Sequence, residues 1–284
     1  NIVLRLFEAA FATEPAPGQH EATPSLIFSM QFQTSDQWNM IHYVLAEYYE
    51  KCTGDDAALI TETACIAWNA VVRRRRDRRD RDEYVLASIE FRGTRCDLVE
   101  DYSHIWGRDF EHEENRILSH FEKLLREWAA AGDAARLNAA LDAFARRNRT
   151  SLMWSVFMEA GAAHPQTLGL LLAEVLNESM FLTHADYAYG AAALVGALHE
   201  AGNAADRERL ERLVLELSQT ARLHENEPRA PTPSWVVHAQ NRLLGVLKES
   251  NIVLASLRDL WRERQAKDAL PANTRPEGPR VISH

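Results

Sequence analysis

The sequence predicts a mainly α-helical fold: an array of antiparallel helical hairpins, an α-solenoid of the HEAT or tetratricopeptide kind, with one small β-hairpin near residues 84–99. Apolar residues recur at helical spacing along most of the 284 residues. Predicted helix starts follow one another at about 17 to 21 residues, so a helix pair recurs every ~35 to 40, which is typical of helical-hairpin repeats. One segment departs from this period and alternates, as a strand does.

The composition divides the chain into five segments. Loops rich in Pro, Glu and Ser or Thr, "TEPAPGQHEATPS" and "HENEPRAPTPS", mark two of the breaks. We expect an N-terminal helical block ending in an Arg/Asp-rich helix, a β-hairpin with an aromatic loop, a helical-repeat block, C-terminal helices and a loose tail, at residues 1–83, 84–110, 111–223, 235–267 and 268–284, respectively.

Two helices are predicted in the first block. The first, in "SDQWNMIHYVLAEYYEKCTG", places one set of side chains on a single face: Trp38, Ile41, His42, Leu45, Tyr48 and Tyr49. The second, in "DDAALITETACIAWNAVV", aligns Ile60, Ala64, Ala67, Trp68 and Val71. This second helix continues into a run of arginines.

The arginine run "VVRRRRDRRDRDEY" is rich in internal charge pairs. In a helix, acids lie one turn after most of its arginines, pairing Arg73 with Asp77, Arg76 with Asp80, Arg78 with Asp82 and Arg79 with Glu83. Arg74 and Arg75 have no acid four residues downstream, while Arg81 has Asp77 one turn upstream. These pairs favour a solvated helix extension. Docking against an acidic protein face and nucleic-acid binding stay open as alternatives.

The strand-like segment is "YVLASIEFRGTRCDLVEDY". Its side chains alternate between Val85 and Phe91, and Arg92-Gly93 is typical of a turn, so we predict a β-hairpin. The loop that follows gathers aromatic and polar side chains, which either seal the hairpin onto the helices or form a recognition surface. With the two arginines above, the candidate partner-binding residues are Arg74, Arg75, Tyr102, His104, Trp106 and Arg108.

Glycine, proline and capping residues mark the predicted helix boundaries in the helical-repeat block. Gly132 is predicted to end one helix in a left-handed cap and Asp133 to start the next. Gly161 and Pro165 are predicted to close a third helix, and Thr183 with Asp186 resembles a capping box. A fourth apolar stripe predicts a regular helix through Leu168, Leu171, Leu172, Val175 and Leu176.

Composition and motifs exclude several function classes. The formal charge of −9 opposes binding to nucleic acid or to an anionic membrane. No run is long and apolar enough to span a membrane, and no signal peptide is recognised. Three cysteines without a Cys-x-x-Cys pair indicate reduced thiols, so we expect a cytoplasmic protein. The chain starts directly in an amphipathic run, and we expect it to be a piece of a longer protein.

No catalytic motif is present in the sequence. A Gly-x-Ser-x-Gly elbow, a phosphate-binding Gly-rich loop and a Glu-x-x-His pair are all absent, and "HEENR" at His112 lacks the second histidine of a zinc site. We therefore expect no cofactor, no metal and no enzymatic activity within this stretch.

The serial helical hairpins together with "EFRGTRCDLVEDYSHIWGRDF" resemble the helical-repeat regions of large bacterial signal-transduction ATPases of the STAND class, which includes anti-phage sensors. The resemblance is architectural and spans about residues 84 to 220. It implies a region that binds a trigger protein beside an ATPase core. The ATPase motifs of that class are absent here, so no functional residue is carried over.

We therefore expect a non-enzymatic scaffold or sensor region that binds a protein partner, and the excess of acidic residues favours a basic one. Two alternatives remain open. One is a compact all-α enzyme whose site uses scattered acids and histidines, such as His42, His184 and His199. The other is a nucleic-acid accessory protein that uses the arginine run. The sequence does not fix the oligomeric state.

Overall fold

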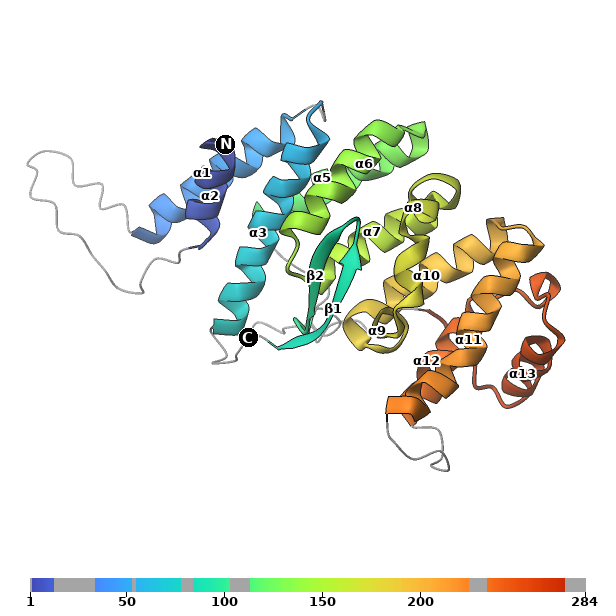
Figure 1. The fold of residues 1–284 in the computed structure, drawn as a ribbon. Coiled ribbons are helices and arrows are strands. Elements are labelled where there is room, and N and C mark those ends of the chain that lie inside the picture. Colours follow the sequence, from blue (N-terminus) through green and yellow to red (C-terminus); the bar gives the residue numbers. More distant parts are fainter. Residues whose placement is uncertain are drawn as a thin grey trace, which may run out of the picture.

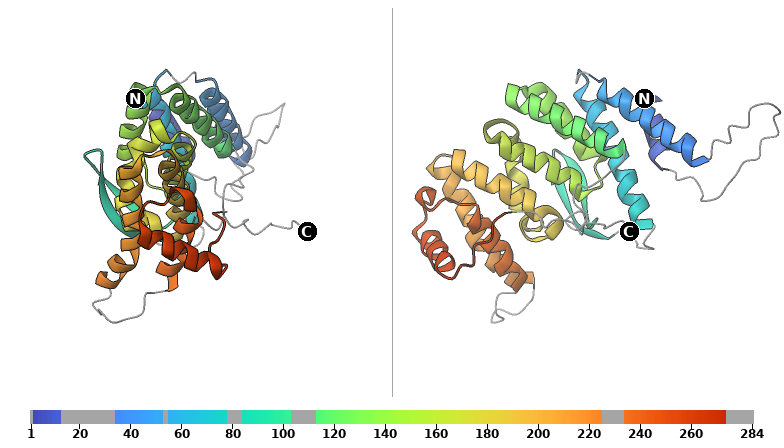
Figure 2. Two further views of the ribbon diagram at one scale, coloured as in Figure 1. Left: turned by 90° about the vertical axis from the view of Figure 1, so that its right-hand side faces the viewer. Right: turned by 180° about the vertical axis from the view of Figure 1, so that it is seen from behind.

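The computed structural model describes residues 2–12, 34–52, 55–77, 84–102, 113–224 and 234–273. These residues form helices that succeed one another in chain order from one end of the molecule to the other, with a two-stranded hairpin on one side (Figures 1 and 2). Contacts link near neighbours of the array, such as α3 with α6, α5 with α7 and α7 with α10. The predicted fold class, mainly α with one small β-hairpin, is confirmed.

The N-terminal half supplies α1 to α6 and the hairpin. Its elements are α1 (Ile2–Ala12), α2 (Thr34–Glu50), α3 (Ala57–Asp77), β1 (Val85–Phe91), β2 (Thr94–Val99), α5 (Glu113–Ala131) and α6 (Ala134–Arg147). The predicted stop and start between α5 and α6 are confirmed. Gly132 has a φ of +66°, and the Asp133 carboxylate accepts a hydrogen bond from the backbone N–H of Arg136.

The C-terminal half is less regular. It contains α7 (Ser151–Ala163), a π-helical turn (Pro165–Gly169), α8 (Leu170–Leu172), a 3₁₀ turn (Ala173–Asn177), α9 (Ser179–Thr183), α10 (Ala185–Ala201), α11 (Ala204–His224), α12 (Ser234–Gly245), a second 3₁₀ turn (Glu249–Asn251) and α13 (Ala255–Ala266). Within the described ranges, every helix is too short or too polar to span a membrane.

The predicted hairpin is confirmed. Arg92 and Gly93 both have positive φ angles, +52° and +68°, which is the geometry of a type I′ turn. The Arg92 guanidinium donates to the side-chain oxygens of Asp142 (2.5 Å) and Asn138 (2.8 Å) on α6. These bonds hold a non-glycine residue in a left-handed conformation and fix the tip of the hairpin to the helical array.

Aromatic side chains join the hairpin to the helices. The Trp154 ring of α7 contacts Phe91 of β1 (centroids 5.3 Å apart), Phe144 of α6 (4.6 Å) and Phe181 of α9 (4.9 Å), each edge to face. Phe181 in turn contacts Tyr187 of α10 at 5.2 Å. All five rings are buried, so one continuous core runs from the hairpin to α10.

The prediction of one regular helix after residue 167 was wrong. Leu168 to Leu176 pass through a π turn, a short α segment and a 3₁₀ turn. Gly161 does not end α7, which continues to Ala163; instead, a side chain at Gly169 would lie 2.8 Å from the Gly161 carbonyl oxygen. The two glycines therefore serve close backbone packing, and the chain after Pro165 deforms to allow it.

The predicted buried face of α2 was partly wrong. His42 and Tyr49 are buried, but Ile41 and Tyr48 are exposed, as are Met40 and Val44. The side chain of Trp38 lies outside the described residues. The helix is apolar nearly all round between residues 40 and 49, so sequence spacing alone does not single out the face that packs.

A buried carboxylate fixes the C-terminal helices. The Glu211 side chain on α11 contacts the ring Nε2 of His199 on α10 at 2.8 Å, and accepts the backbone N–H groups of Val253 (2.8 Å) and Leu254 (2.7 Å). Glu211 and His199 are almost fully buried. Leu254 is the N-cap of α13, and its own backbone N–H, one of the four N–H groups at the helix start that lack an intrahelical partner, is accepted by Glu211.

We expect Glu211→Ala to lower the free energy of unfolding by about 3 to 5 kcal/mol, because it leaves a buried histidine and two N–H groups without their acceptor. Urea unfolding monitored by circular dichroism measures this. Glu208→Ala is the matched control, since the exposed Glu208–Arg212 pair lies one turn earlier on the same helix and contributes only about 0.5 kcal/mol. Equal stability of the two variants would contradict the role of Glu211.

Candidate functional site

The chain leaves β2 through a buried hydrogen-bonded turn. The backbone N–H groups of Asp101 and Tyr102 donate to one carboxylate oxygen of Asp186, at 3.1 and 3.0 Å. Asp186 lies in the first turn of α10 and is 3% exposed. Tyr102 has a φ of +59°, an unfavourable conformation for an aromatic residue. The Asp186 carboxylate therefore holds strained backbone at the point where the aromatic loop begins.

A second buried carboxylate joins the same turn to α7. Asp101 accepts the backbone N–H of Ser151 at 2.7 Å through one oxygen and the Ser151 hydroxyl through the other. Ser151 is the first residue of α7, so the Asp101 charge lies at the positive end of that helix. The turn after β2 is thus fixed to the N-termini of two helices by two different acids.

Tyr187 and His184 complete this arrangement. The Tyr187 hydroxyl donates to the Val99 carbonyl oxygen at 2.9 Å. Burial, with the nearby Asp101 and Asp186 charges, raises the pKa of Tyr187 well above its usual value, so the phenol keeps the proton that it donates. The His184 ring lies 3.7 Å from the Glu100 carboxylate. We call the set Glu100, Asp101, Tyr102, Ser151, His184, Asp186 and Tyr187 the hairpin-exit cluster.

The predicted capping box at the start of α10 was wrong. His184, not Thr183, is the N-cap, and its ring Nδ1 accepts the backbone N–H of Asp186 at 3.4 Å. The Thr183 hydroxyl donates back to the Ser179 carbonyl oxygen. The Asp186 carboxylate accepts from the turn after β2, a partner that is 85 residues away in the chain and that local spacing does not reveal.

The helix that follows the aromatic loop is also fixed. Arg116, in the first turn of α5, donates to both carboxylate oxygens of Glu50 at the end of α2, at 2.9 and 2.5 Å. Hydrogen bonds from Arg116 lower the pKa of Glu50. The guanidinium also lies over the Tyr43 ring. The loop is therefore preceded by the hairpin-exit cluster and followed by a bidentate ion pair.

Of the six predicted site residues, only Tyr102 has both its backbone and its side chain among the described residues. His104, Trp106 and Arg108 lie outside the described residues, and Arg74 and Arg75 are placed in α3 by their backbone, while their side chains lie outside that description. The last turns of α3 and the open end of the hairpin lie at the same edge of the array in Figure 1 and in the right-hand view of Figure 2. Asp101, Ser151 and Asp186 were not among the predicted site residues.

The hairpin-exit cluster does not have the arrangement of a hydrolytic site. Asp101, which accepts the Ser151 hydroxyl, also accepts the Ser151 backbone N–H, so its carboxylate serves the start of α7. The carboxylates of Asp101 and Asp186 are occupied by backbone N–H groups. The cluster therefore orients backbone, and its chemistry is that of helix capping.

The three histidines of the enzyme alternative do not converge. His42 lies on α2, where its ring stacks on Phe11 and contacts the Ala10 carbonyl oxygen at 2.8 Å. His184 and His199 lie at opposite ends of α10, about 22 Å apart along the helix axis. Each has its own structural partner, so no shared site is formed among them.

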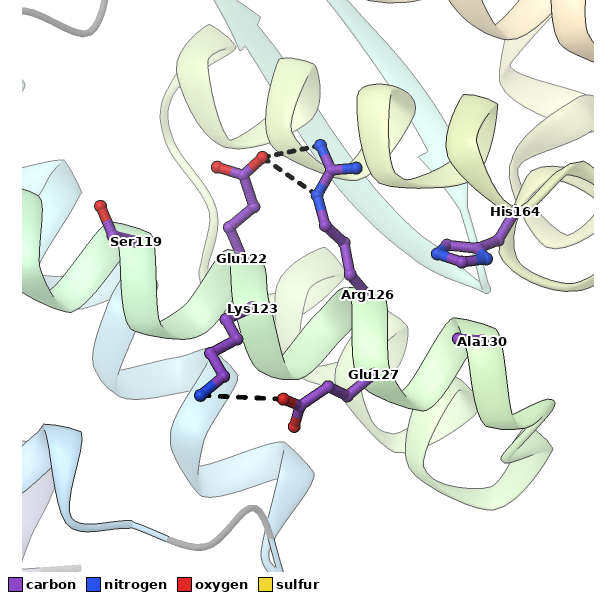
Figure 3. A pocket seen from close by; sticks show the side chains of 7 residues that line it. All are labelled: Ser119, Glu122, Lys123, Arg126, Glu127, Ala130 and His164. Carbon is purple, nitrogen blue, oxygen red and sulfur yellow. Dashed lines mark hydrogen bonds and ion pairs between the residues drawn. The ribbon is translucent and has the colours of Figure 1, made fainter.

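A shallow groove of about 500 Å³ runs beside α5 (Figure 3). It is lined by Ser119, Glu122, Lys123, Arg126, Glu127, Ala130 and, from the end of α7, His164. The charged side chains of α5 pair with one another, Arg126 with Glu122 at 2.8 Å and Lys123 with Glu127 at 3.9 Å. With its charges paired, this groove is a weaker candidate for binding than the hairpin exit.

We expect Asp101→Ala to destabilise the protein by about 3 kcal/mol, because the Ser151 hydroxyl and N–H lose a charged acceptor in a buried place. Asp101→Asn keeps one carbonyl oxygen and should lose about 1 kcal/mol. Denaturant unfolding measures both, with amide hydrogen exchange in the first turn of α7 as the local probe. Asp97→Ala, on the solvent-facing side of β2, is the control; an equal loss there would refute the capping role.

Among the residues that the structure describes, no three His, Cys, Asp or Glu side chains come together to hold a metal ion. Burial raises the pKa of the Cys65 and Cys96 thiols, so neither is an activated nucleophile. In comparisons with known proteins, no family model matches the chain, and no curated protein or solved structure is significantly similar to it.

Proposed function

We propose that this protein is a non-enzymatic helical scaffold or sensor region that binds a protein partner at the edge where the chain leaves the hairpin. The binding surface consists of Tyr102 and the aromatic loop that follows it, together with Arg74 and Arg75 of α3. The array supplies a rigid frame and the loop supplies the contacts, an arrangement common among binding proteins.

The backbone of Tyr102 is the observation that carries this proposal. A tyrosine with a φ of +59° costs free energy, and two buried carboxylates and two helix N-termini are used to keep it there. A turn that only connected a strand to a helix would need no such support. Fixing the base of a loop reduces the entropy that its contacts must overcome on binding.

Charge favours a protein partner over nucleic acid. The net charge is −9, and the hairpin exit contributes Glu100, Asp101 and Asp186. A protein partner with basic side chains opposite Glu100 and acidic side chains opposite Arg74 and Arg75 would be attracted to this edge, whereas the net charge would repel a phosphate backbone. Tyr, Trp and Arg are the residue types that most often anchor protein interfaces, and Tyr102 together with the loop after it supplies all three.

The proposal includes membership in a larger signalling or defence ATPase of the STAND class, in which such repeats bind a trigger protein. The complete open reading frame tests this part. A Walker-type ATPase segment in the same polypeptide supports it, and a gene that encodes no further domain removes it.

Site-specific photo-crosslinking tests the binding surface. A benzoylphenylalanine at position 102 should give one discrete adduct in cells of the source organism, whereas the same group at Leu170, exposed on α8, should not. The crosslinked protein is then purified and titrated against the wild-type chain and against Asp186→Ala. We expect the variant to bind about tenfold more weakly, because the base of the loop is released.

Two outcomes would contradict the proposed surface. The first is an equal adduct from position 170. The second is unchanged affinity of a folded Asp186→Ala variant.

We expect reversal of Arg74 and Arg75 to Glu to weaken binding of that partner more than reversal of Arg78 and Arg79. The first pair has no acid four residues downstream in the sequence, so we propose that it faces acidic side chains of the partner, while the second is followed one turn later by Asp82 and Glu83. Titration of both double variants measures the difference. Retention of the wild-type chain on phosphocellulose, with elution by salt, would instead favour the nucleic-acid alternative.

A further inference from the structure

The outer edge of β1 is open. The backbone of β2 runs next to α6, so β1 is the strand farther from the helices. The hairpin stands clear on one side of the helical array (Figure 2). Two strands make the whole sheet in the described residues, so the second edge of β1 has no strand beside it.

The register identifies the backbone groups on that edge. Phe91 and Thr94 flank the two-residue turn, so they exchange hydrogen bonds, as do Ile89 and Cys96. The N–H and C=O groups of the intervening residues, Ser88 and Glu90, therefore point away from β2. Among the described residues, no backbone group from outside the hairpin bonds to them.

This edge has little of the protection that natural sheets give to their edges. Its sequence, VLASIEF, contains neither proline nor lysine. The register is irregular between Val85 and Ala87, and from Ala87 to Phe91 the pairing is regular. Ser88 and Glu90 are exposed, while Ile89 and Phe91 are fixed in the core on the opposite face. The edge is thus rigid, accessible and correctly spaced for another strand.

We propose that β1 receives an extended segment of the protein partner as a third strand, with its backbone bonded to Ser88 and Glu90. An open strand edge offers N–H and C=O groups at alternate residues, and only an extended peptide matches that spacing. This inference rests on the proposed function: β1 begins at the hairpin-exit cluster, where the backbone N–H of Glu100 donates to the Tyr84 carbonyl oxygen at 3.0 Å.

The acidic residues on the hairpin predict the charge of the partner segment. The solvent-facing side of the hairpin carries Glu90, which lies opposite Arg95 of β2 but makes no ion pair with any described residue, and Asp97, which Ser88 (2.6 Å) and Arg95 (3.6 Å) partner. An opposite charge directly across a strand pair is stabilising. The partner segment should therefore carry Lys or Arg opposite Glu90, on the same face of the sheet.

A random peptide library displayed on phage and selected against the complete chain supplies the probe. We expect the selected peptides to alternate apolar with polar residues and to contain a basic residue. Each is then synthesised and titrated against the wild type, Ser88→Pro and Ser88→Ala. Proline removes the outward N–H and blocks the edge, while alanine keeps the N–H and removes only the hydroxyl.

Ser88→Pro should reduce peptide affinity at least about tenfold, and Ser88→Ala should change it little. Should Ser88→Pro unfold the hairpin, Glu90→Lys provides a second variant with an intact backbone, and it should select against basic peptides. Equal binding by folded Ser88→Pro, or no effect of Glu90→Lys on basic peptides, would overturn strand addition.

N-methylation of the peptide separates this mode from others. Methylating successive amides should abolish binding at every second position, because alternate N–H groups of an added strand face β1. Loss at every position, or at none, contradicts the proposal.

A second copy of this chain is the other possible occupant of the edge. If the wild type forms a dimer in sedimentation and Ser88→Pro is monomeric, the edge binds a second copy of this chain and not a partner segment. If the crosslinked partner binds Ser88→Pro and wild type equally, strand addition fails while the surface at Tyr102 stands.

Discussion

Buried carboxylates that accept backbone N–H groups hold this array together at its least regular points. Asp101 accepts from the start of α7, Asp186 from the turn after β2, and Glu211 from the start of α13. In each case the acid belongs to one element and the N–H groups to another. Burying a charge is costly, and it is tolerated where every oxygen finds a donor and the positive end of a helix lies near. These bonds determine where the hairpin and the last helix sit.

Hydrophobic packing explains the rest of the array, but it leaves relative positions less sharply defined. The rings from Phe91 to Tyr187 form a continuous core, and aromatic contacts of this kind tolerate some rotation and sliding. A carboxylate that accepts two directed hydrogen bonds tolerates much less rotation or sliding, because either movement would lengthen the bonds. The hairpin therefore has two directional anchors: Arg92 bonded to α6 at its tip, and the Asp101 and Asp186 pair at its open end. Between them the strands lie on an apolar surface.

Much of this fold follows from local sequence signals. Spacing of apolar residues predicted the long helices, Gly132 with Asp133 marked a boundary that the structure reproduces, and Arg92-Gly93 identified the hairpin. Other features depend on residues distant in the chain. Asp186 has the position of a local cap but serves a turn 85 residues earlier, and Gly169 is required by the approach of Gly161. The exposed side of α2 was misassigned because its apolar residues surround the helix. Of the predicted site, Tyr102 and the edge reached by α3 are located, whereas His104, Trp106 and Arg108 lie outside the described residues.

The anchoring of the aromatic loop has a consequence for how such a protein can diversify. Tyr102 before the loop and Arg116 after it are held by residues that do not belong to the loop itself, Asp186 and Glu50. Lengthening a loop whose ends are fixed costs little, about 0.6 kcal/mol for each doubling of its length. Asp186 and Glu50 would therefore keep the two anchors in place in a chain whose segment between them differs in sequence or length. On the proposed function, related chains with the same acids and a different segment between the anchors would recognise different partners.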